Sequence, residues 1–136
     1  IMADATYGPK VYRKQGGDEL VVASGGKITH EGQTAVTQAT SITTGVTCSA
    51  LSGVITTVSQ TVAAGAEAEF TVTNTLVEAT DVVVACIKTH TSAGTFMVMV
   101  SAVAAGSFKL RLTNLDASAA GNNVLVINFL VLKCAV

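Results

Sequence analysis

Residues 107–114 read SFKLRLTN, and in this segment apolar and polar side chains alternate without interruption. Phe108, Leu110 and Leu112 fall on one side of an extended strand, and the residues between them fall on the other. A strand with this pattern has one face against a core and one face in water, as in a sheet that covers a core. The segment therefore predicts β-structure with Phe108, Leu110 and Leu112 in the core.

The segments around this strand also favour β-structure. Residues 69–74 and 96–102 are expected to form further strands, while residues 82–87 and 123–133 are apolar almost throughout. A continuous apolar run predicts a strand that is covered on both faces, either in a core or at a subunit interface. Val and Thr are frequent, the chain has a single proline, and no long helical pattern has a cap at its start. We predict an all-β chain.

The composition predicts how these strands are arranged. Hydrophobic residues make up 49% of the 136 residues and charged residues 12%, about half the usual share of roughly 25%. Short strands joined by glycine-containing turns are typical of a β-sandwich of Greek-key or jelly-roll type. Such a sandwich buries one face of each sheet, so the remaining apolar surface predicts association of several copies through sheet faces.

The first part of the chain differs from the rest. Residues 1–36 contain four of the eight Lys and Arg residues and two glycine pairs, but few residues suited to a core. We expect an extended arm or small hairpin over 1–36, with short strands, followed by the sandwich domain over 37–136. The candidate subunit-interface or capsid contacts in this arm are Tyr7, Lys10, Tyr12, Arg13, Lys14, Leu20 and Val22.

Charge and hydropathy exclude several classes of function. A formal net charge of −1 provides no basic stripe for nucleic acid. The longest apolar stretch, residues 124–132, is nine residues long and contains Asn128, which is too short for a membrane span of about 18 residues. No secretory signal pattern is present, and three widely spaced cysteines predict free thiols in a cytosolic product. Cys86 is expected to be buried with a raised thiol pKa, and Cys134 to react first.

The residues that could carry chemistry do not form a recognisable site. Cys86 and His90 would be about 13 Å apart along a strand, too far to share a zinc ion. Asp116 with its neighbouring asparagines predicts a polar turn rather than a calcium site. A nucleophilic pair of Cys48 with a histidine has no supporting motif. We therefore expect no enzyme activity, no catalytic residue, no metal and no cofactor.

Two further surface patterns can be explained without a binding site. The basic residues Lys109 and Arg111 are favoured as solubilising side chains over a site for an acidic partner. The Ser- and Thr-rich residues 37–47 could bind sugar by their hydroxyl groups, but no exposed aromatic side chain is expected beside them to stack on a sugar ring.

Four stretches resemble a family of small structural proteins of tailed phages, namely capsid decoration or cement proteins, including those of cyanophages. They are VTQATSITTGVTCSALSGVITTVSQTVAAGAEAEFTVTN at 36–74, VVVACIKT at 82–89, SAGTFMVMVSAVAAGSFKLRLTN at 92–114 and NVLVINFLVLK at 123–133. The resemblance covers about residues 35–133. Its most telling pieces are SITTGVT at 41–47, AAGA at 63–66, AVAAGSF at 102–108 and INF at 127–129.

The resemblance implies a homotrimeric β-sandwich on the outside of an icosahedral phage capsid. Its partners would be further copies of itself and the major capsid protein, with no nucleic acid and no membrane. It would be made in the host cytoplasm and would be located in the virion, on the outer surface of the capsid. Two alternatives stay open at this point: a head- or tail-fibre module that binds a receptor, and a carbohydrate-binding module.

Overall fold

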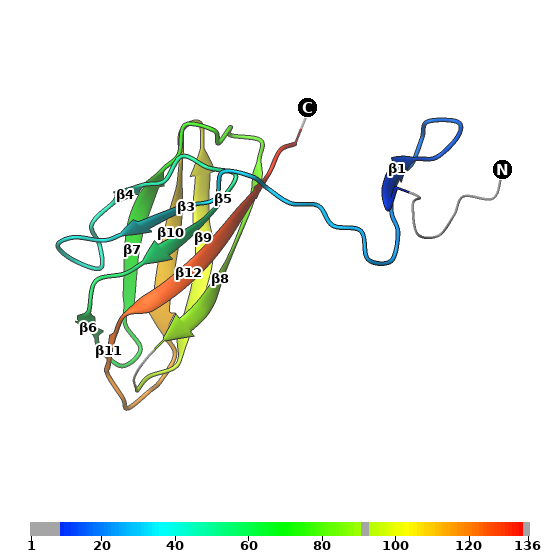
Figure 1. Ribbon diagram of the computed structural model, residues 1–136. Coiled ribbons are helices and arrows are strands. Elements are labelled where there is room, and N and C mark those ends of the chain that lie inside the picture. Colours follow the sequence, from blue (N-terminus) through cyan, green and yellow to red (C-terminus); the bar gives the residue numbers. More distant parts are fainter. Residues whose placement is uncertain (1–8, 91–92, 135–136) are drawn as a thin grey trace. The chain divides into compact units, whose positions relative to one another are not determined.

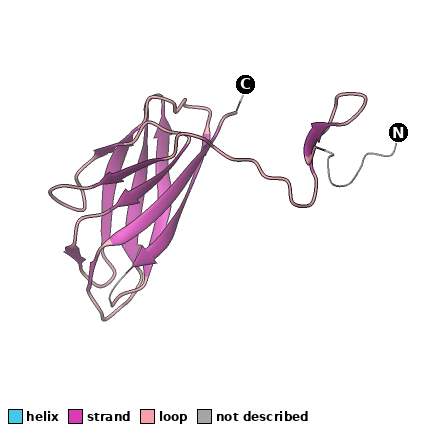
Figure 2. Cartoon of the chain, in the orientation of Figure 1, coloured by secondary structure: helices cyan, strands magenta, loops and turns pink. Residues whose placement is uncertain are grey.

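The computed structural model describes residues 9–90 and 93–134, and all regular structure in these residues is β (Figures 1 and 2). No helix occurs among them, so the described residues include none that could cross a membrane. The strands are β1 (Val11–Arg13), β2 (Leu20–Val22), β3 (Thr34–Thr37), β4 (Val46–Thr47), β5 (Ser52–Thr56), β6 (Gln60–Val62), β7 (Glu67–Thr73), β8 (Val82–His90), β9 (Phe96–Ala104), β10 (Ser107–Asn114), β11 (Gly121–Asn123) and β12 (Leu125–Leu132).

Two four-stranded sheets form the main body of the fold. One has the order β4-β7-β10-β9 and the other the order β3-β5-β12-β8, with a small pair of strands, β11-β6, beside them. The pairings are antiparallel except for β3 with β5 and β4 with β7. The two large sheets pack against each other, which confirms the all-β prediction and agrees with a β-sandwich. The Greek-key or jelly-roll type stays a prediction.

Strand β10 places its apolar residues in the core, as its alternation predicts. Phe108, Leu110 and Leu112 are at most 1% exposed. In the ladder, Leu110 is paired with Phe70 of β7 on one side and with Val100 of β9 on the other. The central strand of one sheet thus contributes a continuous row of buried side chains.

Strand β12 provides the matching row from the other sheet. Its alternate residues Leu125, Ile127, Phe129 and Val131 are at most 3% exposed. The rings of Phe108 and Phe129 meet across the two sheets with their centroids 5.1 Å apart. Contacts of this kind between the central strands join the two sheets into one core.

The two continuous apolar runs are each covered on one face only within the chain. In β8, Val83 is 9% exposed, whereas its neighbours Val82 and Val84 are 49% and 52% exposed. In β12, the side chains between the core residues are half-buried or exposed. Burial of both faces in the core is therefore wrong for these strands, and a subunit interface remains as the alternative.

The chain divides between Glu31 and Gly32, earlier than the expected boundary at residue 37. The difference arises at β3, because Thr34–Thr37 pairs in parallel with β5 and so belongs to the sandwich sheet. The part before Gly32 contains the two-stranded antiparallel pair β1-β2, in which Tyr12 faces Val21 in register. The short strands expected within residues 1–36 therefore include the two strands of a hairpin.

One glycine of the sandwich leaves no room for a side chain. A Cβ on Gly53 of β5 would lie 2.5 Å from a ring carbon of Phe129 and 2.9 Å from Sγ of Cys48. We expect Gly53→Ala to destabilise the fold by about 1–3 kcal/mol through overpacking. Chemical denaturation would measure this, with the outward neighbour changed in Ser52→Ala as the control. Equal stability of Gly53→Ala and the wild type would contradict the packing around Phe129.

Candidate functional site

The described candidate contact residues lie on or beside the β1-β2 hairpin. Two backbone hydrogen bonds close its turn, from Lys14 N to Glu19 O (2.9 Å) and from Gly17 N to Lys14 O (2.9 Å). Gly16 and Gly17 both have positive φ, at 106° and 87°, a backbone conformation that favours glycine. The glycine pair is thus the reason that the two short strands can turn back on each other.

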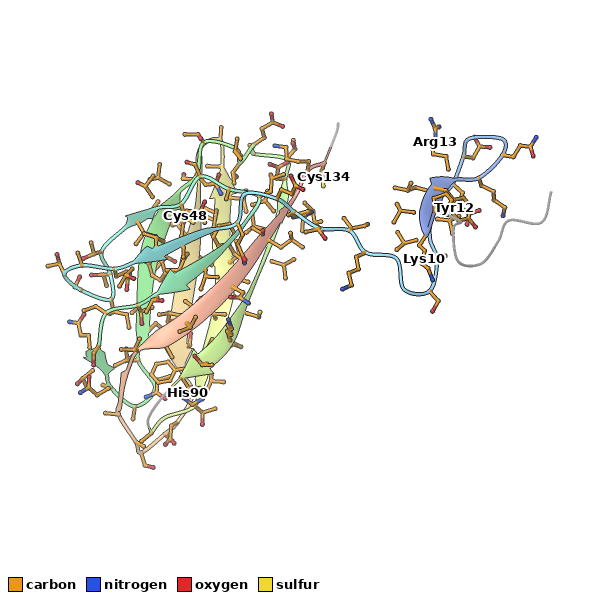
Figure 3. The ribbon with its side chains drawn as sticks, in the orientation of Figure 1. Lys10, Tyr12, Arg13, Cys48, His90 and Cys134 are labelled. Atoms are coloured by element: carbon orange, nitrogen blue, oxygen red, sulfur yellow. The ribbon has the colours of Figure 1, made fainter. Side chains whose placement is uncertain are left out.

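Six of the seven predicted contact residues are exposed on or beside this hairpin, and Tyr7 lies outside the described residues. Tyr12 and Val22 are each 42% exposed, and Leu20 is 63% exposed. The basic side chains bind the hairpin itself: Lys10 Nζ donates to Ser24 O at 3.2 Å, and Arg13 Nη2 donates to Gly17 O at 2.7 Å. Figure 3 shows Lys10, Tyr12 and Arg13 on this element.

The hairpin therefore presents apolar side chains more freely than charge. Lys14 forms an ion pair with Glu19 at 3.0 Å, which compensates its charge. Val11, Leu20 and Val22 are exposed, and the described residues 9–31 include no buried hydrophobic side chain. The exposed side chains available to a partner therefore include these three apolar residues and the aromatic ring of Tyr12.

A second surface with exposed apolar side chains lies on the outer side of the β3-β5-β12-β8 sheet. Lys88 is the only Lys, Arg, Asp or Glu in these four strands. We name this surface the apolar sheet face. Its members are Val54 of β5, Val82, Val84 and Cys86 of β8, and Val126, Asn128, Leu130 and Leu132 of β12.

The outer side of the other sheet is charged and internally paired. Glu69 of β7 accepts hydrogen bonds from Ser101 Oγ at 2.7 Å, Arg111 Nη2 at 3.0 Å and Lys109 Nζ at 3.3 Å. Arg111 is also within 3.5 Å of Glu67. The hydrogen bond from Ser101, followed by those from Lys109 and Arg111, lowers the pKa of Glu69. Lys109 and Arg111 thus form ion pairs within the chain, as is typical of a solvated surface.

A buried carboxylate ties the end of β12 to the loop before β8. The side chain of Asp81 has no exposed area and accepts hydrogen bonds from Lys133 Nζ at 2.7 Å, Glu78 N at 2.8 Å and Cys134 N at 3.2 Å. Lys133 lowers the pKa of Asp81, and Asp81 in turn raises the pKa of Lys133. A hollow of about 390 Å³ adjoins this pair, lined by Leu51, Thr75, Leu76, Glu78 and Lys133.

This pair predicts a loss of stability in acid. Because the pKa of Asp81 is lowered in the folded state, its contribution is present above the unfolded value of about 3.9 and declines as the pH falls through the folded value. The raised pKa of Lys133 removes its contribution only in strong alkali. We expect Asp81→Asn to be less stable at neutral pH and to show a shallower loss in acid. Denaturation between about pH 2 and pH 7 would measure both, and an unchanged acid slope would contradict the role of Asp81.

All three cysteines are free, as expected, but their exposure differs from the prediction. Cys86 is exposed, because the outer side of β8 is uncovered within the chain, and its expected burial is wrong. Cys48 is the buried thiol, and burial raises its pKa. Its Sγ lies 3.7 Å from Thr34 O. Figure 3 shows Cys48 within the sandwich.

The exposure of the three cysteines predicts that Cys86 is the first thiol to react, in place of Cys134. In dilute protein, Cys86 is expected to react first, half-buried Cys134 second and Cys48 last, since access favours that order and burial raises the pKa of the Cys48 thiol. Timed labelling with a maleimide, followed by peptide mass spectrometry, would measure the three rates. Faster labelling of Cys48 than of Cys86 would contradict the placement of β8.

The residues considered for metals do not converge. The described residues contain no group of three or more His, Cys, Asp or Glu side chains that could hold an ion. His90 packs its ring near that of Phe96, with centroids 6.4 Å apart. Asp116 Oδ1 accepts hydrogen bonds from Ser118 N at 2.9 Å and Ala119 N at 2.8 Å, which lower its pKa. Asp116 thus organises the polar turn that its sequence predicts.

One residue of the apolar sheet face was not among the candidates predicted from the sequence. Asn128 lies on β12 in register with Cys86 of β8 and Val54 of β5. Its Oδ1 is buried and accepts no hydrogen bond from a described residue. The available signal was a single amide in the middle of an apolar strand.

A scan of protein-family models, a search of curated proteins and a search of solved structures each found no match for this chain.

Proposed function

We propose that this chain is a structural virion protein, without enzyme activity, that decorates and stabilises the outside of an icosahedral phage capsid as a homotrimer. The resemblance to phage cement proteins over about residues 35–133 supports this function, and the sandwich formed by the same residues is compatible with it. The partners are further copies of the chain and the major capsid protein, and the site of action is the outer surface of the virion.

One observation carries the proposal: both the hairpin and the apolar sheet face present exposed apolar side chains. A cement protein needs contacts of two kinds, to its own copies and to the shell. Several linked copies then bind the shell far more tightly than one, although each copy offers a modest contact. We assign the shell contact to the hairpin residues Lys10, Tyr12, Arg13, Leu20 and Val22.

The two alternatives have weaker support. Sugar binding favours an exposed aromatic ring, and in the sandwich the four phenylalanines are buried or half-buried: Phe70, Phe96, Phe108 and Phe129. Tyr12 of the hairpin is the exposed aromatic side chain among the described residues. A fibre module has no specific feature here in its favour.

Cryo-electron microscopy of the particle that contains this chain tests the function. Density for the sandwich on the outer surface of the head, at regular lattice positions, is the expected result. Density on the tail would assign the chain to a fibre instead. Absence of the chain from purified particles, measured by mass spectrometry, would overturn both structural functions.

A further inference from the structure

The geometry points to a specific contact between copies: we infer that they associate through the apolar sheet face, with Asn128 of each copy beside the rotation axis. The inference deepens the proposed function, and rests on it for the expectation that several copies act together. The partner is a second copy of this chain, and a third where the axis is threefold.

The two outer sides of the sandwich provide an internal comparison. In the β4-β7-β10-β9 sheet, Glu67, Glu69, Lys109 and Arg111 form a network of ion pairs on the outer side. In the β3-β5-β12-β8 sheet, the corresponding side has one charged residue, Lys88, where the β8–β12 register is interrupted. Exposed apolar residues occur on both outer sides, since Met97 and Met99 of β9 lie on that of the first sheet, but only that side has a network of charges. An apolar side almost without charge is typical of a surface that a partner covers.

Asn128 indicates what kind of partner this is. Asn128 is half-buried, whereas its Oδ1 has almost no exposed area and accepts no hydrogen bond from a described residue. A buried acceptor left without a donor is unfavourable, and rotation of the amide can turn Oδ1 outward. An amide both donates and accepts, so the Asn128 of another copy can satisfy it.

Symmetry favours a copy of the chain over a different protein. A rotation axis beside Asn128 brings amide to amide, and each Nδ2 then donates to the Oδ1 of the next copy. The face is otherwise almost without charge, so it offers little with which to select a charged partner. A central asparagine in an apolar contact sets the register of association, as buried amides do in coiled coils.

The size of the face predicts the strength of the contact. The four strands have 4, 5, 9 and 8 residues, and at about 3.3 Å per residue and about 4.8 Å between strands they cover about 400 Å² per copy. A standard interface buries about 800 Å² per partner. The face alone therefore supports association that depends on concentration, and binding to a shell would reinforce it.

The test compares two lysine substitutions at similarly exposed positions on opposite faces. Val84 of β8 is 52% exposed on the apolar sheet face, and Met99 of β9 is 45% exposed on the charged face. Sedimentation equilibrium of the full chain should show oligomers for the wild type and for Met99→Lys. We expect Val84→Lys to raise the dissociation constant at least about tenfold, because a buried lysine charge has no partner there.

A second variant and a chemical probe test the place of the axis. Asn128→Asp has nearly the same shape but puts like charges beside one another, so it should weaken association at least about tenfold at neutral pH. Its thermal unfolding in dilute protein reports whether the subunit still folds. Cys86 lies beside Asn128 in register, so maleimide labelling of Cys86 should slow as the wild-type concentration rises, but not in Val84→Lys.

The outcomes separate this inference from the proposed function. A wild-type chain that stays monomeric at every concentration, or equal association of Val84→Lys and the wild type, overturns the inference. Unchanged association of a folded Asn128→Asp removes Asn128 from the axis. If the copies associate through this face while shells remain undecorated, the inference holds and the capsid function fails.

Discussion

Replacing Leu110 by alanine is expected to lower the free energy of unfolding by about 2–5 kcal/mol. Leu110 has no exposed area and sits in the middle of β10, between Phe70 and Val100 of the adjoining strands. Truncation removes its buried methyl groups and leaves a cavity that the two packed sheets can close only in part. Chemical denaturation monitored by circular dichroism would measure the change.

Lys109→Ala is the matched control for this prediction. Lys109 precedes Leu110 on the same strand, but its side chain is 49% exposed and forms an ion pair with Glu69 at 3.3 Å. Such an exposed pair contributes at most about 1 kcal/mol. If Lys109→Ala proved the more damaging of the two substitutions, the assignment of the two faces of β10 would be wrong, because a shift of one residue exchanges them.

Deleting residues 1–31 is expected to leave a folded β-sandwich that binds capsids much more weakly. The deletion ends at Glu31 because a longer one would approach β3, which pairs with β5 in the sandwich sheet. Under the proposed function each copy contributes one hairpin, and loss of simultaneous contacts reduces apparent affinity by about 100-fold or more. Co-sedimentation with undecorated shells would measure the affinity, and far-ultraviolet circular dichroism would report the fold.

Two point variants separate the hairpin surface from a general effect of shortening the chain. Leu20 is 63% exposed, so Leu20→Ser should weaken shell binding without a change in thermal stability. Lys14→Ala is the control, since Lys14 is already paired with Glu19 on the exposed turn. Decoration by the shortened chain with unchanged affinity would exclude the hairpin and direct the search for the shell contact to the sandwich.

The sequence alone was sufficient to predict the strands whose pattern is local. In residues 107–114 every second side chain is apolar, and a strand turns these residues to one side whatever lies next to it. The same reasoning places Phe70 and Val72 of β7 in the core, where both are at most 2% exposed. The glycine pair at 16–17 likewise predicts a turn, because the required backbone conformation is a property of the residue itself.

Other features depend on segments that are distant in the sequence. Residues 34–37 resemble the arm in composition, and their parallel pairing with β5 makes them part of the sandwich. Asn114 appears as the polar end of a strand, yet it has no exposed area and its Nδ2 donates to Val62 O at 3.2 Å and Ala119 O at 2.9 Å. Every residue has a backbone carbonyl, so the sequence does not show which carbonyl accepts a hydrogen bond from the Asn114 side chain.

The placement of Cys86 and Asn128 on the outer side of their sheet also depends on segments that are distant in the sequence. A run such as VVVACI at 82–87 is apolar on both sides, so its pattern does not distinguish the side that the chain covers. The sequence determined that these residues form strands and that the chain has more apolar surface than a small sandwich hides. Only the tertiary structure decided which side of each strand meets the core, because that choice depends on the sheet packed opposite and not on the strand itself.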